Sequence, residues 1–469
     1  MQQPDWSGPL AAAYGGALAF LTDLPGHPVG ASQDREALLA ALDGPLPEQP
    51  HPAAGVIEQL AAAADPGIMR STGGRFFGFV VGGSTPAALA ADWLTSAWDQ
   101  NTGLFALAPS ATTIEQVAGR WLRELLGLPD DATTGFVTGG QMANFTGLAA
   151  ARHEMLRRAG WNVEVDGLFG APRLRVLVGA ERHDTIDLAL RYLGVGTAAI
   201  EVVAADEQGR MDPLALAGAL EDADGPIIVC AQAGGVNSGA IDPVGEICDL
   251  AHAAGAWVHV DGAFGLWAAA SPSRRHLLDG VDRADSWATD AHKWLNVPYD
   301  SGLIFCAHPQ AHRAALSVRA GYLMHGSGDP FELTPELSRR ARGIPVYAAL
   351  RNLGRTGVAA LVEGGCAAAT RFAELLAAHP GVRIHNDVTL NQVLVSFDDD
   401  DARTRAVVDL VQGDGTCWVS GSVWRGRAVM RISVSNWSTD PSDVDASVQA
   451  ILRCLQAERA TAPASQLEM

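Results

Sequence analysis

Hydrophobic and polar positions in the middle of the chain form two alternating patterns. Short, nearly continuous apolar runs over residues 174–179, 226–231 and 256–261 predict buried strands. Segments with helical spacing of apolar residues, such as 113–126 and 244–253, lie between or beside these runs. This order predicts an α/β fold with a mostly parallel sheet that helices cover on both faces.

The pattern changes beyond Arg342, where a long helical stretch over residues 346–376 precedes several short strands. The strands and the closing helix predicted after it are 382–385, 391–397, 428–434 and 443–457. This mixture predicts a second, smaller α+β domain at the C-terminal end of the chain.

Residues 1–70 are Ala-rich, helical in pattern and interrupted by Pro and Gly, so we expect little core of their own. Together these patterns predict three parts. They are an N-terminal helical segment over 1–80, a large domain over 81–345 and a small domain over 346–469.

Charge and composition exclude several classes of protein. The formal net charge is −20 and the basic residues form no stripe, which excludes nucleic acid as a main partner. We expect neither a membrane span nor a secretory signal, because no apolar run has the required length and flanking charges. The six cysteines form no C-x-x-C pair and the histidines show no ligand spacing, so we expect no metal and a reducing, cytoplasmic location.

Lys293 is the only lysine in the 469 residues, although the chain contains 32 arginines. Arginine replaces lysine as a surface charge, but its guanidinium stays protonated and cannot act as a nucleophilic amine. A retained single lysine therefore indicates amine chemistry, and chance survival is the less favoured alternative. The strand predicted over 256–261 ends in Asp261, at the edge of a parallel sheet where α/β proteins bind ligands. A Schiff-base lysine together with an aspartate for a pyridinium nitrogen is typical of pyridoxal phosphate (PLP) enzymes.

Other candidate residues are less specific. The turn Thr138-Gly139-Gly140-Gln141 precedes a predicted helix, so its backbone N–H groups could hold a phosphate, although such turns are common. His183 follows a predicted strand and could stack on an aromatic ring, or it could be a solvated histidine at the start of a helix. His259 could face either the site or the opposite layer of the fold.

The run Asp290-Ala291-His292-Lys293-Trp294 resembles the cofactor-lysine segment of the PLP-dependent group II amino-acid decarboxylases. That family includes the aromatic-amino-acid, glutamate, histidine and diaminobutyrate decarboxylases. The resemblance spans about residues 70 to 435 and includes Gly139-Gly140, His183, 259–263 and 338–342.

This resemblance implies fold-type I, the aspartate-aminotransferase-like architecture, and a homodimer with active sites at the subunit interface. It implies that Lys293 binds the cofactor, that Asp261 pairs with its ring nitrogen, and that His183 and Ala263 lie on the two ring faces. It assigns the phosphate to one set of residues: Gly139, Gly140, Gln141, Asp290 and His292.

The expected reaction is decarboxylation of an L-amino acid that the sequence does not identify. Members of the family often carry a loop tyrosine that protonates the α-carbon, whereas this chain has Phe331, Glu332 and Leu333 there, and Tyr322 lies earlier. Decarboxylation-coupled oxidative deamination and carbon–carbon cleavage are therefore alternatives, as is a PLP-binding protein without turnover. Product analysis with and without oxygen would separate these alternatives.

Overall fold

A seven-stranded sheet forms the centre of the computed structural model, which describes residues 5–221, 225–317 and 329–461. Its strand order is β2-β8-β7-β6-β5-β3-β4, and only β8 runs antiparallel to its neighbours. The strands are β2 (Thr133–Val137), β3 (Arg175–Gly179), β4 (Ile200–Val203), β5 (Ile227–Gln232), β6 (Trp257–Asp261), β7 (Ser286–Asp290) and β8 (Gly302–Cys306). The predicted α/β fold with a mostly parallel sheet is confirmed.

Helices cover both faces of this sheet, because the side chains of each strand point alternately to the two sides. One face packs on α6 (Gly140–Arg158), α8 (Asp184–Tyr192) and α11 (Pro309–Leu316), and Trp257 of β6 belongs to that core. The other face packs on α5 (Pro109–Leu126), α9 (Pro213–Glu221) and α10 (Val244–Ala253), with Val258 and Val260 between them. A short helix, α7 (Val163–Asp166), follows α6.

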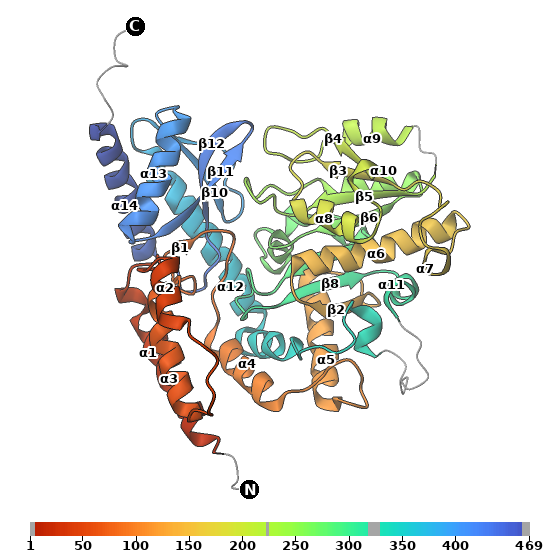
Figure 1. Ribbon diagram of the computed structural model, residues 1–469. Helices are drawn as coiled ribbons and strands as arrows, with labels where there is room; N and C mark the ends of the chain where they lie inside the picture. The colour runs from red at the N-terminus through yellow and green to blue at the C-terminus, as the bar shows by residue number, and fades with distance from the viewer. Residues whose placement is uncertain (1–4, 222–224, 318–328, 462–469) are drawn as a thin grey trace.

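The small domain contains a five-stranded sheet in the order β1-β11-β12-β10-β9. Its strands are β1 (Phe76–Phe77), β9 (Val382–Ile384), β10 (Gln392–Phe397), β11 (Trp418–Trp424) and β12 (Arg427–Ser433), and its helices include α13 (Asp401–Asp414) and α14 (Pro441–Thr461). The long α12 (Gly343–Ala377) runs from the large domain to this sheet (Figure 1). Because β1 pairs with β11, the segment before residue 80 contributes a strand to the small domain.

The N-terminal helices are α1 (Ser7–Asp23), α2 (Arg35–Leu42) and α3 (Ala53–Ala64), and none of them contains a buried residue. This confirms that the segment has little core of its own. These helices lie beside the small domain and near α4 (Pro86–Trp98) (Figure 1).

Two features differ from the expected pattern. The stretch predicted as one helix over 346–376 contains a break at Gly354, whose φ of 60° is favourable for glycine alone. The strand β7, directly before the lysine segment, was not predicted, since its sequence Ser-Trp-Ala-Thr-Asp mixes polar and apolar residues on a strand that is buried throughout. No helix among the described residues is long and apolar enough to cross a membrane.

Candidate active site

Lys293 lies in the connection between β7 and β8, just beyond the carboxyl end of β7. Its Nζ is 3.0 Å from Oδ2 of Asp290, the last residue of that strand, and its side chain is only partly exposed. The neighbouring strand β6 ends at Asp261, which is in register with Ala288 of β7. The structure therefore brings Lys293 and Asp261 to the same edge of the sheet, where α/β proteins bind their ligands.

The Asp261 carboxylate is 4% exposed and has no cation as a partner among the described residues. Its Oδ2 accepts a hydrogen bond from Asn144 Nδ2 at 3.0 Å, and its Oδ1 accepts one from the backbone N–H of Ala263 at 3.2 Å. A buried carboxylate is costly without a positive partner, so this position fits the protonated ring nitrogen of a pyridoxal cofactor.

The glycine turn packs directly on the lysine segment. Gly139 precedes α6, and a Cβ added to Gly140 would lie 2.8 Å from Asp290 Oδ2. A Cβ added to Gly139 would lie 3.2 Å from Cε1 of His292. The free N–H groups at the start of α6 therefore lie beside the lysine segment, where they can bind an anion.

Three buried polar atoms in these same segments have no hydrogen-bond partner among the described residues: Gln141 Nε2, Ser301 Oγ and Asp290 Oδ1. Ser301 precedes Gly302, which packs against the backbone of Gly139. Two of the three atoms are donors beside a helix N-terminus, so the residues present fit a phosphate group. Ser301 was missed from the sequence, because a serine in a loop gives no signal until its burial is known.

His292 lies between the glycine turn and the lysine. Its Nδ1 accepts the N–H of Ser301 at 3.1 Å, and its Nε2 lies 3.5 Å from Asp290 Oδ1. Burial lowers the pKa of His292, although the Asp290 carboxylate opposes this shift. The ring of Tyr299 stacks on it with centroids 4.2 Å apart, which adds a phenol that the sequence had not indicated.

His183 is the N-cap of α8, where its Nδ1 accepts the backbone N–H of Thr185 at 3.2 Å. Its ring is exposed, as expected for a histidine at the start of a helix. His183 and Asp261 also line one small cavity, so the ring lies near the site. His183 can therefore be a solvated histidine at the start of a helix and still stack on an aromatic ring in the site. Ala263 follows Asp261, and its carbonyl accepts the N–H of Asp290 at 2.9 Å.

The backbone of the lysine segment is fixed by Asn296, which is fully buried and has a φ of 54°. Its Oδ1 accepts the N–H groups of Gly83 at 2.7 Å and Trp437 at 3.0 Å, and its Nδ2 donates to the Ser435 carbonyl at 2.9 Å. A Cβ added to Gly82 would lie 1.9 Å from the Lys293 carbonyl oxygen. Segments from three parts of the chain therefore converge on Lys293.

Arg431, like Ser301 and Tyr299, was not indicated by the sequence. It is 8% exposed, no carboxylate pairs with it among the described residues, and burial lowers its pKa. On β12 it lies opposite Ser420 of β11, whose hydroxyl accepts the N–H of Phe79 at 3.2 Å. Since paired residues point to the same side of a sheet, Arg431 lies on the side where Ser420 contacts Phe79.

The expectation that Phe331, Glu332 and Leu333 stand near the reacting carbon stays a prediction, since it concerns a site that two chains would share. These residues form a short 3₁₀ helix (Pro330–Leu333), in which Phe331 is 2% exposed and Glu332 pairs with Arg313 of α11 at 3.2 Å.

A Cβ added to Gly135 would lie 2.5 Å from the Leu333 carbonyl, so this turn covers the middle of β2. The carboxyl end of β2, beside Lys293, lies further along the strand. Tyr322 lies outside the described residues.

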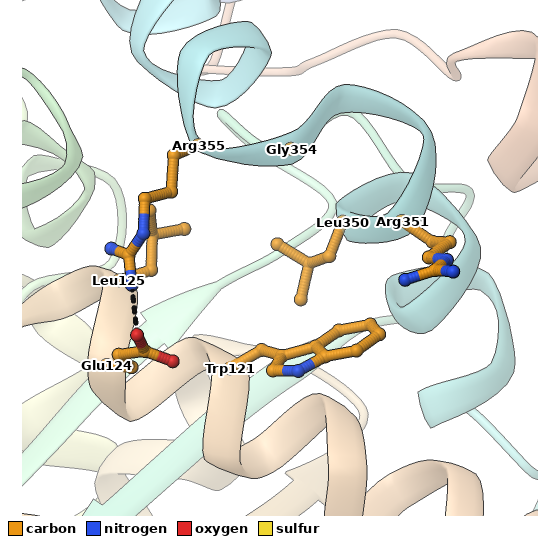
Figure 2. Close-up of a pocket in the computed structure, with 7 residues that line it drawn as sticks. All are labelled: Trp121, Glu124, Leu125, Leu350, Arg351, Gly354 and Arg355. Atoms are coloured by element: carbon orange, nitrogen blue, oxygen red, sulfur yellow. Dashed lines mark hydrogen bonds and ion pairs between the residues drawn. The ribbon is translucent and has the colours of Figure 1, made fainter.

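A cavity of about 330 Å³ lies elsewhere, between α5 and α12 (Figure 2). Trp121 forms its floor, and the ion pair between Arg355 and Glu124 closes one side. The break of α12 at Gly354 creates this notch. None of its lining residues belongs to the site around Lys293, and the size of a cavity alone does not indicate a function.

Comparison with known proteins agrees with this geometry. The family model described as the pyridoxal-dependent decarboxylase conserved domain matches residues 36–398. Tryptophan decarboxylase 1 from Oryza sativa subsp. japonica is 30% identical over 416 residues, which cover 81% of this chain and 80% of that protein. Phenylacetaldehyde synthase from Arabidopsis thaliana is 25% identical over 423 residues, or 85% of each chain.

Among solved structures, a crystal structure of Oryza sativa TDC with PLP and tryptamine superposes with a TM-score of 0.90. It is 25% identical in sequence, and the match covers 97% of this chain and 99% of that one. The fold and the site thus define a fold-type I, PLP-dependent enzyme. The chain belongs to the pyridoxal-dependent decarboxylase family, and it is an amino-acid decarboxylase that uses PLP.

The close contact at Gly82 gives a first prediction. Gly82→Ala should push the Lys293 carbonyl aside and lower turnover about 10²-fold, since a displacement of about 1 Å at reacting groups has that effect. Steady-state turnover and bound cofactor per chain measure it. Gly364→Ala is the control, because its Cβ would meet nothing within 4 Å. Equal activity of both variants would show that the contact does not position Lys293.

Proposed function

We propose that this enzyme removes the α-carboxylate of an L-amino acid as CO₂, with the cofactor bound covalently to Lys293 Nζ. The observation that supports this most is the position of the only lysine beside the buried, unpaired Asp261 carboxylate at one edge of the sheet. When bound, pyridoxal phosphate supplies an electron sink for the pair of electrons left when the carboxylate departs.

The side chains around Lys293 have separate roles in this proposal. Asp261 holds the proton on the ring nitrogen, which makes the ring a stronger electron acceptor. His183 would stack on one face of the ring, and Ala263 would pack on the other. Asp290 holds Lys293 Nζ through its ion pair at 3.0 Å, which orients the amine.

The phosphate site consists of the α6 N-terminus with Gly139, Gly140 and Gln141, supported by the Ser301 hydroxyl and by His292. A bare carboxylate would repel a phosphate, so Asp290 acts there through the histidine beside it. Its Oδ1 lies 3.5 Å from His292 Nε2.

Arg431 of β12 is a buried positive charge that pairs with no carboxylate among the described residues. We propose that this guanidinium attracts a carboxylate of the substrate, since a buried cation is stabilised by an anion and Arg binds carboxylates through paired hydrogen bonds. Tyr299 stacks on His292, and the N–H of Phe79 bonds to Ser420 opposite Arg431. Both aromatic side chains are exposed and would contact the substrate side chain. The amino acid itself is not determined by these contacts.

The α-carbon must receive a proton in place of the carboxylate to give the amine. In the alternative reaction, O₂ and water are consumed, and aldehyde, ammonia and hydrogen peroxide are released with CO₂. We propose amine formation with His183 as the acid. Its Nδ1 accepts the Thr185 N–H, so the proton of the neutral ring is on Nε2.

We also propose that the enzyme is a homodimer with active sites at the interface. Large apolar side chains are exposed on α1 and α4 and in the turn after α4; they include Leu10, Tyr14, Leu18, Trp98, Phe105 and Leu107. Tyr14 of α1 contacts Trp93 of α4 edge to face, so these helices share one surface. A second copy of the chain would bury it, as large exposed apolar surfaces generally require.

Two features support further proposals about organisation and location. The division into residues 1–80, 81–345 and 346–469 is proposed with β1 as the strand that joins the first part to the third. All six cysteines are free and buried, which supports a reducing, cytoplasmic location.

The covalent role of Lys293 is tested by borohydride reduction of the purified enzyme followed by peptide mapping. We expect one pyridoxyl group per chain, on Lys293. Lys293→Arg keeps the positive charge but should show no fixed cofactor and at least about 10³-fold lower turnover, because a guanidinium cannot act as the amine. Unmodified Lys293 in a yellow, active enzyme would contradict the proposal.

The products are tested by measuring amine and aldehyde with and without O₂. Wild type should give mainly amine under both conditions. His183→Phe keeps a flat ring but has no proton to give, so amine formation should fall about 10²–10⁴-fold and the aldehyde share should rise in air. Phe331→Tyr should leave the ratio unchanged. If Tyr322→Phe shifts the ratio and His183→Phe does not, the acid is Tyr322.

The dimer is tested by sedimentation velocity. The wild type should sediment as a dimer, and Leu10→Arg on α1 should shift it toward monomer and lower activity. Leu214→Arg is the matched control, since Leu214 is equally an exposed leucine but lies on α9, away from α1 (Figure 1). A monomeric, fully active wild type would contradict the proposal.

A further inference from the structure

The alternation of β6 places Trp257, His259 and Asp261 on one face of the sheet, which α6 covers. All three side chains are buried, and His259 is fully inaccessible. Asn144 of α6 lies between His259 and Asp261 and is 1% exposed. His259 therefore faces the same layer as Asp261, which resolves the ambiguity left by the sequence.

These groups form a chain of hydrogen bonds whose direction can be derived. The Trp257 indole is a donor only, and its Nε1 donates to Ser286 Oγ at 3.0 Å. At the other end the Asp261 carboxylate only accepts, so Asn144 turns its Nδ2 toward Asp261 and its Oδ1 toward His259. The histidine proton is therefore on Nε2, and the Ser286 hydroxyl donates to His259 Nδ1 at 2.8 Å. That Nε2–H donates to Asn144 Oδ1 at 3.0 Å, and Asn144 Nδ2 donates to Asp261 Oδ2 at 3.0 Å.

The Asp261 carboxylate fixes the orientation of the Asn144 amide. If the amide were reversed, its oxygen would face the carboxylate, and two acceptors would meet with no proton between them. The chain also requires an uncharged His259, and burial lowers the pKa of His259 to about 3. Each donor therefore points toward Asp261.

The second N–H of the Asn144 amide donates to Thr185 Oγ1 at 3.1 Å. That hydroxyl lies 3.0 Å from Nδ1 of His183, which also accepts the Thr185 backbone N–H. One amide group thus connects to both Asp261 and His183, the two side chains proposed to act on the cofactor ring.

A glycine in α6 leaves room for the His259 ring beside Asn144. Gly147 lies one helical turn after Asn144, and a Cβ there would be 2.7 Å from Cε1 and 2.8 Å from Nδ1 of His259. The imidazole therefore fits under α6 only because residue 147 has no side chain.

We propose that Asn144 is a positioning residue that fixes the Asp261 carboxylate toward the cofactor, and that His259 fixes Asn144. This inference rests on the proposed role of Asp261 as the partner of the ring nitrogen. It assigns a function to a histidine and an asparagine that touch neither substrate nor cofactor.

The test compares Asn144→Leu, Asn144→Asp and His259→Phe with wild type. The Kd for PLP is measured by absorbance titration, and the rise in Tm on adding PLP to the apo protein is measured separately. Loss of a hydrogen bond to a charged carboxylate should weaken PLP binding about tenfold or more. Asn144→Asp should weaken it further, because a second negative charge would face Asp261. His259→Phe retains a flat ring but no donor, and should give a smaller loss.

The rise in Tm with PLP separates positioning from general stability, because it depends on cofactor affinity. It should shrink in all three variants. The control is Asn386→Leu, which removes a buried asparagine that bonds to Ser238 and Gln392 and makes no bond to Asp261. That variant should lower the Tm of the apo protein and leave the rise with PLP unchanged.

Asp261→Asn, measured in parallel, distinguishes the two possible failures. If Asp261→Asn binds PLP as tightly as wild type, the proposed function of Asp261 is wrong. If Asp261→Asn weakens binding but Asn144→Leu and His259→Phe both match wild type, only the positioning inference is overturned. His259→Phe keeps that second outcome measurable even if the Asn144 variants fail to fold.

Discussion

A carboxylate buried at the end of a central strand is the constraint on which the site depends. Asp261 is 4% exposed, accepts two N–H donors and has no cation among the described residues. Removing such a charge from water costs several kcal/mol, which neutral hydrogen bonds offset only in part. We propose that the protonated ring nitrogen of the cofactor is the positive partner that completes this balance.

The lysine is held by a different kind of interaction. Lys293 lies in a loop, and loops are less ordered than the strands that they connect. Here the Asn296 amide makes bonds to the 82–85 segment and to residues 435–437 of the small domain, and Gly82 allows the backbone to approach. The lysine position therefore depends on the contact between this loop and the small domain, which links the packing of the two domains to the chemistry.

The sequence singled out two residues that the structure brings to the same end of the sheet. Asp261 was identified because a buried apolar strand ended in it, and Lys293 because it is the only lysine. The partners of these residues were not found, because they come from distant positions: Asn144 and Asp261 are separated by 117 residues. Ser301 and Arg431 were also missed, since a lone serine or arginine becomes informative only when its burial and lack of a partner are known.

The central claim is that Asp261 keeps the cofactor ring nitrogen protonated. The most direct measurement is the ¹⁵N NMR shift of ring-labelled PLP bound to wild type and to Asp261→Asn. The account predicts a protonated nitrogen in wild type over the whole pH range of activity and an unprotonated one in the variant. An unprotonated nitrogen in the active wild-type enzyme, or the same shift in both proteins, would contradict it.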